Sequence, residues 1–429
     1  MGSLKSKLKA LVMVAGVVVA LLAVVYRVYL VMHRAVPADL AEVEKIRWLD
    51  EMGRIARYGS QLLQYFGIEP GIEPLKLFIN TAFSILVSPL PWQRVRYRDV
   101  RVSQDVYAGV PVSTYTPVHP QSDTDGYPTI IYFHGGGWTW LSVGVYDGPL
   151  KHLANYTKFK VIAVEYRKSP QHPFPAAYED SLAVTRYVIN NARDLNICKD
   201  LIVVAGDGAG GNLAAAVANE MASLIRLQVL INPALQMLNF ATPSYQEHVD
   251  NAIPGITSTE KTVSSWMRYA HVHADVKPAM LDNLHVSLRH YSFLSNFVDS
   301  RRRLPAYLNV TDKHTIHNSA CREEVSSVLD QYVLDSRFNP MFAPDVRNVA
   351  DAYIITAQYD VLRDEGLMYG HRLQENGVDV ELQHYKNGFH GFFLFAGGGW
   401  IEFAESQRAM EDLVSYLHTE VLDLPLSDI

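Results

Sequence analysis

The longest uninterrupted apolar stretch of the chain lies at its N-terminus. It runs from Ala10 to Tyr26 and continues after Arg27 to Met32, which is long enough to span a bilayer as a helix. Lysines precede this stretch and acidic residues follow it, and Arg27 can reach the membrane interface, so the charge pattern favours a cytosolic N-terminus. We expect a cytosolic tail over residues 1–9 and a transmembrane signal anchor over residues 10–32.

Short motifs near the anchor and in the body bear on this topology. Val36-Pro37-Ala38 resembles a processing site, so a cleaved signal peptide is the alternative to an anchor. Gly2 fits the N-myristoylation pattern and would have to be cytosolic. Asn155 and Asn309 begin N-x-[ST] sequons and fit glycosylation of a body that lies across the membrane from the tail.

The hydrophobic period changes twice after the anchor. Amphipathic helical spacing from residue 37 to residue 91 predicts a helical lead-in or lid over residues 33–94. Apolar strand-like runs then alternate with helical patterns, which predicts an α/β fold with a mostly parallel sheet covered by helices on both faces. The strand-like runs are residues 95–102, 110–116, 129–133, 161–166, 201–205, 227–231, 353–356 and 380–384, and the helical ones are 177–191, 212–224, 363–376 and 401–418.

The alternation lapses between residues 239 and 349, where polar, aromatic and methionine residues mix. This interruption predicts a cap inserted between two parts of the core, residues 95–238 and 350–429. A cap of this kind would cover the carboxyl end of the sheet, where open α/β folds bind ligands.

The composition and the absence of certain motifs argue against several classes of function. The net charge of -7 comes with no long basic run, so no nucleic-acid partner is expected. Cys198 and Cys321 lack metal-finger spacing, and whether they form a disulfide stays open. No H-E-x-x-H motif accompanies the cap histidines, so we expect no metal site; these histidines are His271, His273, His314 and His317.

A glycine loop follows the third strand-like run directly. The run "PTIIYF" leads into His134 and the three glycines that precede Trp138. Backbone N–H groups free of side chains at the end of a strand can point into one spot, which is how an oxyanion hole is made. A second "GGGW", at residues 397–400, follows no strand ending in histidine, and we expect a plain loop there.

The stretch "IVVAGDGAGGNLAAAVA" has the strand, tight turn and helix of a nucleophile elbow, G-x-S-x-G. Gly208 occupies the position of the serine. The glycines at 206, 208 and 211 also match the dinucleotide fingerprint G-x-G-x-x-G. We disfavour a nucleotide site because the strand does not open a βαβ unit and no acidic residue ends a strand near residue 230.

Two further polar residues follow strand-like runs late in the chain. Asp360 lies between a strand and a helix, and His390 lies in a loop before the last helix. The order of elbow, Asp and His along the chain is that of the α/β hydrolases.

Together these motifs resemble the hormone-sensitive-lipase family of α/β hydrolases, and within it the arylacetamide deacetylase and neutral cholesterol ester hydrolase branch. The resemblance covers nearly the whole chain and also includes "EYRKSPQHPFPAAYED" and "YDVLRDEGLMYGHRL". It implies a type II anchor in the endoplasmic reticulum membrane, a lumenal body, hydrolysis of lipophilic esters or amides, and no cofactor.

The resemblance also implies roles for single residues. The oxyanion donors would be the N–H groups of Gly135, Gly136 and Ala209, with His134 and Gly137 completing the motif, and Asp360 would orient His390. The departure from the family pattern is Gly208. It predicts an impaired carboxylesterase, deacetylase or lipase-like hydrolase, or alternatively a ligand-binding pseudoenzyme, as in the plant gibberellin receptors that resemble this family.

Overall fold

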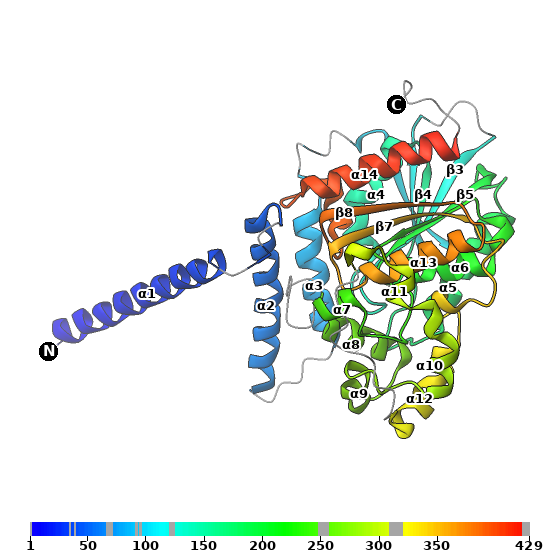
Figure 1. The fold of residues 1–429 in the computed structure, drawn as a ribbon. Helices are drawn as coiled ribbons and strands as arrows, with labels where there is room; N and C mark the ends of the chain where they lie inside the picture. Colours follow the sequence, from blue (N-terminus) through cyan, green and yellow to red (C-terminus); the bar gives the residue numbers. More distant parts are fainter. Residues whose placement is uncertain are drawn as a thin grey trace.

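We describe the protein from a computed structural model. The structure describes residues 2–33, 36–37, 40–65, 72–90, 93, 97–119, 125–247, 257–308 and 321–422, without the side chains of residues 2–11 and 56–64. Figure 1 shows a long N-terminal helix attached to a body in which helices surround a central sheet. The sequon at Asn309 and the cap residues His314 and His317 lie outside the described residues.

The central sheet has eight strands in the order β1-β2-β4-β3-β5-β6-β7-β8. β1 and β2 pair antiparallel with their neighbours, and every pair from β4 to β8 is parallel. This arrangement agrees with the mostly parallel sheet predicted from the pattern. The strands are β1 (Val100–Tyr107), β2 (Val110–Pro117), β3 (Tyr127–Phe133), β4 (Lys160–Val164), β5 (Ile197–Asp207), β6 (Leu227–Ile231), β7 (Asp351–Tyr359) and β8 (Val380–Phe389).

The first strand begins later than its apolar pattern predicted. The expected strand covered residues 95–102, but Asp99 lies in a turn and β1 starts at Val100. A two-residue hairpin turn at Ala108 and Gly109, both with positive φ, pairs Tyr107 with Val110. The turn geometry therefore sets the register of β1 against β2.

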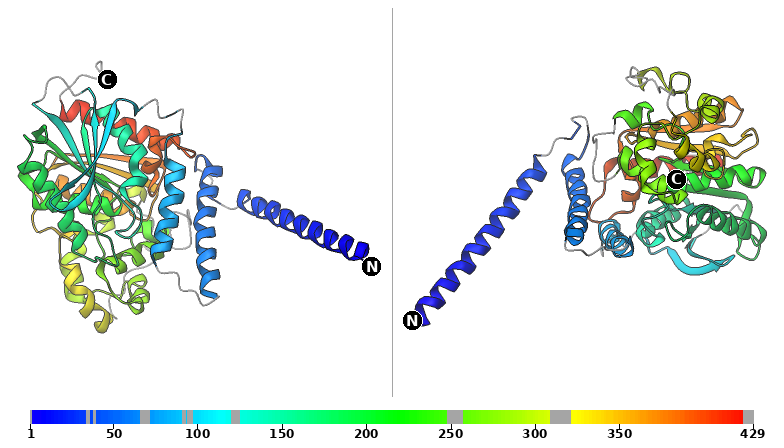
Figure 2. Two further views of the ribbon diagram at one scale, coloured as in Figure 1. Left: turned by 180° about the vertical axis from the view of Figure 1, so that it is seen from behind. Right: turned by 90° about the horizontal axis from the view of Figure 1, so that it is seen from below.

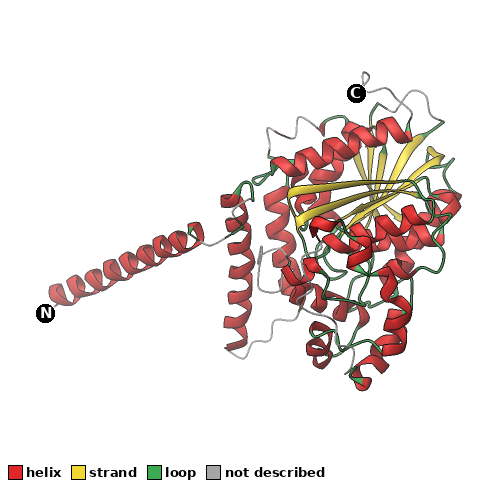
Figure 3. Cartoon of the chain, viewed as in Figure 1, coloured by secondary structure: helices red, strands yellow, loops and turns green. Residues whose placement is uncertain are grey.

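Helices cover both faces of the sheet (Figure 3). Successive residues of a buried strand alternate between the faces: Ile131 and Phe133 of β3 belong to one apolar core, and Ile130 and Tyr132 belong to the other. The first core includes α5 (Ala176–Asn190), α6 (Ala209–Glu220) and α13 (Arg363–Glu375), and the second includes α4 (Asp147–Thr157) and α14 (Ala404–Tyr416).

The segment between β6 and β7 is helical and forms the part of the body below the sheet in Figure 1. One of its helices, α8, begins after Ser258, whose hydroxyl accepts a hydrogen bond from the N–H of Lys261. Trp266 and Tyr269 of α8 pack against Trp138 at the end of the glycine loop, with ring centroids 4.6 and 4.3 Å apart. The helices of the segment are α7 (Pro243–Glu247), α8 (Thr259–Ala270), α9 (Lys277–Leu281), α10 (Leu288–Leu294), α11 (Ser300–Arg303) and α12 (Glu323–Val333).

In the described part of the chain before the sheet, the α-helices are α1 (Gly2–Met32), α2 (Val43–Tyr65) and α3 (Ile72–Val87). α1 extends away from the body in every view of Figures 1 and 2. Its residues from Val12 to Met32 are long and apolar enough to cross a membrane. Near its end, Arg27 forms a 2.6 Å ion pair with the buried Glu51 of α2, so this arginine holds α1 against α2.

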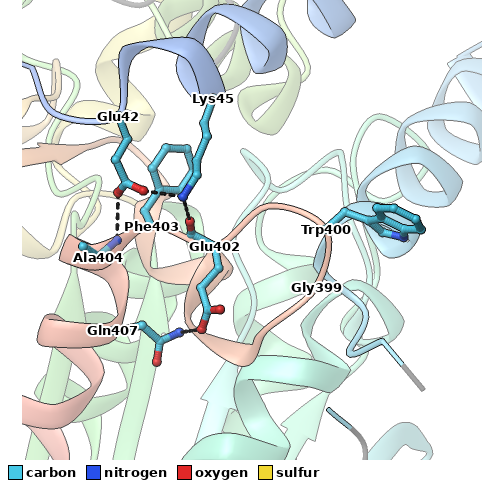
Figure 4. A pocket seen from close by; sticks show the side chains of 8 residues that line it. All are labelled: Glu42, Lys45, Gly399, Trp400, Glu402, Phe403, Ala404 and Gln407. Carbon is cyan, nitrogen blue, oxygen red and sulfur yellow. Dashed lines mark hydrogen bonds and ion pairs between the residues drawn. The ribbon is translucent and has the colours of Figure 1, made fainter. Parts of the chain in front are cut away.

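A surface pocket lies between the start of α2 and the start of α14 (Figure 4). A carboxylate oxygen of Glu42 accepts a hydrogen bond from the N–H of Ala404, and Lys45 bonds both Glu42 and the carbonyl of Glu402. The second "GGGW" ends beside this pocket, where the N–H of Trp400 donates to Leu86 of α3. These contacts attach the lead-in helices to the body.

Candidate active site

Gly208 occupies the turn between β5 and α6. Its φ of 53° and ψ of -111° lie outside the regions that residues with a Cβ readily adopt. The turn is fixed by backbone hydrogen bonds: the N–H of Gly208 donates to Ile231, and its carbonyl accepts from Asn212 and Ala234. A Cβ at this position would lie 3.4 and 3.5 Å from Cε1 and Nε2 of His390. A side chain on residue 208 would therefore face the histidine.

The other glycines of the stretch are required by close packing. A Cβ on Gly206 would lie 2.3 Å from the carbonyl oxygen of Gly210, and one on Gly210 would lie 1.8 Å from that of Phe133. Gly211 is similarly close to Pro233, at 2.9 Å. Close packing at Gly206 and Gly211 and the positive φ of Gly208 thus account for the three glycines of the dinucleotide fingerprint without a bound phosphate.

His390 follows β8 directly and is held by Asp360. Its Nδ1 lies 3.0 Å from Oδ1 of Asp360, which is fully buried and also accepts the N–H of Leu362 at 2.9 Å. Burial lowers the pKa of His390, but attraction by Asp360 and Asp207 outweighs burial, so the pKa lies above its ordinary value. The arrangement suits a general base whose orientation is set by a carboxylate.

The glycine loop is anchored by Asp207, the residue before Gly208. Oδ1 of Asp207 accepts the N–H of Gly135 at 2.9 Å and the hydroxyl of Tyr132 at 3.0 Å, and Oδ2 accepts the hydroxyl of Tyr146 at 2.7 Å. Gly135 was expected to donate into an oxyanion hole, but its N–H is already engaged with this carboxylate. The structure thus differs from the expectation at Gly135.

Three other N–H groups stay open at the same place. Among the described residues, the N–H groups of Gly136, Gly137 and Ala209 donate no hydrogen bond. Gly136 has φ of +107°, and a Cβ there would lie 2.3 Å from the carbonyl oxygen of Trp140, so this bend in the loop requires glycine. Gly136, Gly137 and Ala209 all line the cavity described below, so these residues border the same space.

His134 lies behind the loop and is buried. Its Nδ1 is 2.7 Å from the carbonyl oxygen of Gly135, and its ring stacks on Tyr166 with centroids 4.4 Å apart. The hydroxyl of Tyr166 donates to the carbonyl of His134 at 2.7 Å. Burial lowers the pKa of His134 to about 4, so this imidazole is neutral and braces the loop.

A cavity of about 870 Å³ opens over Gly208 and His390. The glycine loop and α8 both line it, and so does α3 of the lead-in. This agrees with the expectation that the lead-in and the segment after β6 together close a pocket over Gly208 and His390. The α3 side chains are apolar, as in most ligand sites: Leu75, Phe78, Ile79, Ala82, Phe83 and Leu86.

The remaining candidate residues lie apart from this cavity. Asn155 is half-buried on α4, and the hydroxyl of Thr157 in its sequon bonds Leu153. Cys198 and Cys321 are both free thiols. Over the described residues, no group of three or more His, Cys, Asp or Glu side chains is placed to hold a metal.

A family model described as the alpha/beta hydrolase fold matches residues 130–297 and 279–394. A hyperthermophilic esterase from the archaeon Pyrobaculum calidifontis is 25% identical with a TM-score of 0.57, over 84% of this chain and 96% of that one. The family match spans most of β3, the strands β4 to β8, the glycine loop, the β5–α6 turn and His390. The chain belongs to the α/β-hydrolase family, and the predicted fold is confirmed.

Two relatives place the chain more narrowly within that family. Arylacetamide deacetylase from Bos taurus is 33% identical over 400 residues, which is 89% of this chain and 94% of the relative. Neutral cholesterol ester hydrolase 1 from Bos taurus is 30% identical over 385 residues, 84% of this chain and 88% of the relative. The chain lies in the branch that contains these carboxylic ester hydrolases.

Proposed function

We propose that this protein binds lipophilic esters or acetamides in the cavity over Gly208 and hydrolyses them poorly. The observation that carries the proposal is the geometry at residue 208. A Cβ on Gly208 would lie 3.4 Å from Cε1 of His390, so the histidine faces the position where a side chain would begin. In a serine hydrolase this position holds the attacking hydroxyl. The base, its carboxylate and the open N–H groups are all consistent with this chemistry.

The remaining chemistry would use water as the nucleophile. His390 takes a proton from a water molecule, whose oxygen attacks the substrate carbonyl, and the N–H groups of Gly136, Gly137 and Ala209 stabilise the resulting oxyanion. His390 then returns the proton to the leaving alcohol or amine. In a protease triad, loss of the serine costs roughly a millionfold in turnover and leaves about 10³–10⁴-fold over water.

The substrate class follows from the cavity wall and from the names of the relatives. Helix α3 contributes only apolar side chains to the cavity, and the two relatives are named for cholesterol esters and aryl acetamides. An acyl, aryl or sterol group against α3 would bury apolar surface without leaving polar groups unsatisfied.

For the location, we propose the endoplasmic reticulum membrane with a single span and a lumenal body. The apolar part of α1 and the lysines before it support this orientation.

The alternative is a pseudoenzyme that carries or senses a small lipophilic molecule. Gly208 favours it, because a formed cavity with no hydroxyl at position 208 can bind a ligand without consuming it.

A fluorophosphonate probe tests which function applies, since it labels only an activated nucleophile. The natural chain should stay unlabelled in detergent, Gly208→Ser should be labelled, and Gly208→Ser with His390→Ala should not. Labelling of the natural chain would mean that another residue acts as nucleophile and that the proposal is wrong.

A further inference from the structure

Arg268 of α8 lines the catalytic cavity beside the glycine loop. Its Nε donates to Oγ1 of Thr139 at 3.3 Å, and its Nη2 donates to Oγ of Ser265 at 3.1 Å. The guanidinium carbon lies 5.4 Å from the ring centroid of Trp140. These contacts hold the plane of the guanidinium in one orientation at the cavity wall.

This guanidinium has no acidic partner among the described residues. No carboxylate oxygen of a described residue lies within 4.0 Å of its nitrogen atoms. The two acids that line the cavity are engaged elsewhere: Asp207 holds the glycine loop, and Glu260 is bonded to Lys277 at 2.7 Å. Burial alone lowers the pKa of Arg268 to about 10, and at neutral pH the group stays charged.

The charge lies close to the open N–H groups. Helix α8 touches the glycine loop at Gly137, where a Cβ would lie 2.6 Å from Oγ of Ser265. The same hydroxyl accepts the hydrogen bond from Arg268. The guanidinium is therefore separated from the proposed oxyanion site by a single serine side chain, while the apolar α3 wall lines another part of the cavity.

A partly buried cation without a counter-ion is unfavourable unless a ligand supplies the opposite charge. Nη1 of Arg268 makes no hydrogen bond to any described residue, and Nη2 has one remaining donor. Two parallel N–H groups of a guanidinium match the two oxygens of a carboxylate. The fit favours a carboxylate over a neutral polar group.

We propose that Arg268 binds an acid group of the ligand, so that the preferred ligands are lipophilic esters or amides that carry a carboxylate a few bonds from the carbonyl. Half-esters and half-amides of short dicarboxylic acids have this chemistry. The placement of the ester carbonyl over Gly208 rests on the proposed function, but the preference for an acid rests on Arg268 alone.

The competing role for Arg268 is structural, as a link between α8 and the glycine loop through Ser265 and Thr139. A structural link would affect stability and the binding of every ligand equally. Recognition of an acid would instead separate a charged ligand from its neutral analogue. Lysine at this position keeps the charge but not the two-pronged geometry, so it should retain part of the preference.

The test uses the full chain in a non-ionic detergent and a matched ligand pair that resists hydrolysis. N-octylsuccinamic acid carries a carboxylate, and N-octylsuccinamide replaces it with a neutral amide of the same shape. Binding of each is measured by titration calorimetry to the natural chain, Arg268→Met and Arg268→Lys. Arg289→Met, which removes an exposed cap arginine of α10, is the matched control.

The natural chain and Arg289→Met should bind the acid about tenfold or more tightly than the amide, the usual worth of a charged hydrogen-bonded pair. Arg268→Met should lose this preference, and Arg268→Lys should keep part of it. Equal affinity of the natural chain for both ligands would overturn the proposal even if Arg268→Met fails to fold, as would equal losses for both ligands in a folded Arg268→Met. Tighter binding of octyl phosphate than of N-octylsuccinamic acid would overturn the assignment of a carboxylate and indicate a phosphate as the acid group that Arg268 binds.

The outcome is independent of catalysis, because neither ligand is turned over. If Gly208→Ser stays inactive while the acid preference persists, the proposed function fails and the assignment of Arg268 stands. If the preference is absent while Gly208→Ser is active, the reverse holds.

Discussion

At Gly208, the backbone and the chemistry place opposite demands on one residue. The φ and ψ of the turn cost a residue with a Cβ about 1–3 kcal/mol. A serine in an active hydrolase bears that strain for the sake of its hydroxyl, whereas glycine relieves it. Glycine also has no hydroxyl to accept an acyl group, and this is the basis of the proposal that the turn is easier to form but catalyses poorly.

The raised pKa of His390 makes a prediction for pH. In Gly208→Ser the base must be neutral, so kcat/KM should fall as pH drops through a pKa above the ordinary histidine value. Asp360→Asn removes the attraction that raises this pKa, so the acidic limb should move to lower pH. The plateau should also fall by orders of magnitude, because the tautomer is no longer held.

The measurement is a pH profile of ester hydrolysis by Gly208→Ser and by Gly208→Ser with Asp360→Asn. An acidic limb that does not move in Asp360→Asn would mean that Asp360 does not act on His390.

Which backbone N–H groups stay open could not be predicted at the residue scale. The sequence shows three consecutive glycines after His134, and nothing local distinguishes the first from the third. The difference arises from Asp207, 72 residues later along the chain, which accepts the N–H of Gly135. The acid of the "GDG" turn is the signal that could have been used, since a buried carboxylate must find donors.

At the scale of elements, the turn between β5 and α6 depends on glycine for packing as well as for conformation. Gly210→Ala would place a Cβ 1.8 Å from the carbonyl oxygen of Phe133 in β3. Overpacking of this kind should lower the free energy of unfolding by about 1–3 kcal/mol or more. Urea denaturation followed by circular dichroism measures the change.

Gly144→Ala is the control for this prediction. Gly144 is exposed, and a Cβ there would approach only Oγ of Ser142, at 3.8 Å. Its unfolding curve should match that of the natural chain. A Gly210→Ala variant as stable as Gly144→Ala would contradict the close contact between α6 and β3.

The elements that could be predicted are those whose own run of apolar residues shows that they are buried. β6, with all five residues buried, matches the expected run at residues 227–231. The predicted start of β1 was wrong, and the hairpin turn sets the pairing of this strand with β2. The place of α3 at the cavity could not be chosen from the sequence, because the glycine loop and α8, which line the same cavity, lie much later in the chain. The surroundings of Arg268 were likewise not apparent, because its lack of an acidic partner among the described residues depends on how the chain folds in three dimensions.

At the scale of the whole molecule, α1 should cross a membrane, with its N-terminal end on one side and the body on the other. In sealed microsomes, added protease should spare the body and remove only residues before the span, because the lysines stay cytosolic. Endoglycosidase should shift the mass of the natural chain, and Asn155→Gln should reduce that shift if this sequon is used. Digestion of the body without detergent would reverse the orientation.

The most direct test of the account is the turnover of a p-nitrophenyl ester by the natural chain and by Gly208→Ser. Thermal unfolding of each variant should first show that it is folded. We predict that the natural chain is nearly inactive, that Gly208→Ser gains several orders of magnitude, and that adding His390→Ala abolishes the gain. A folded Gly208→Ser no more active than the natural chain, or a natural chain with the turnover of an ordinary esterase, would contradict the claim that the glycine alone disables an otherwise complete site.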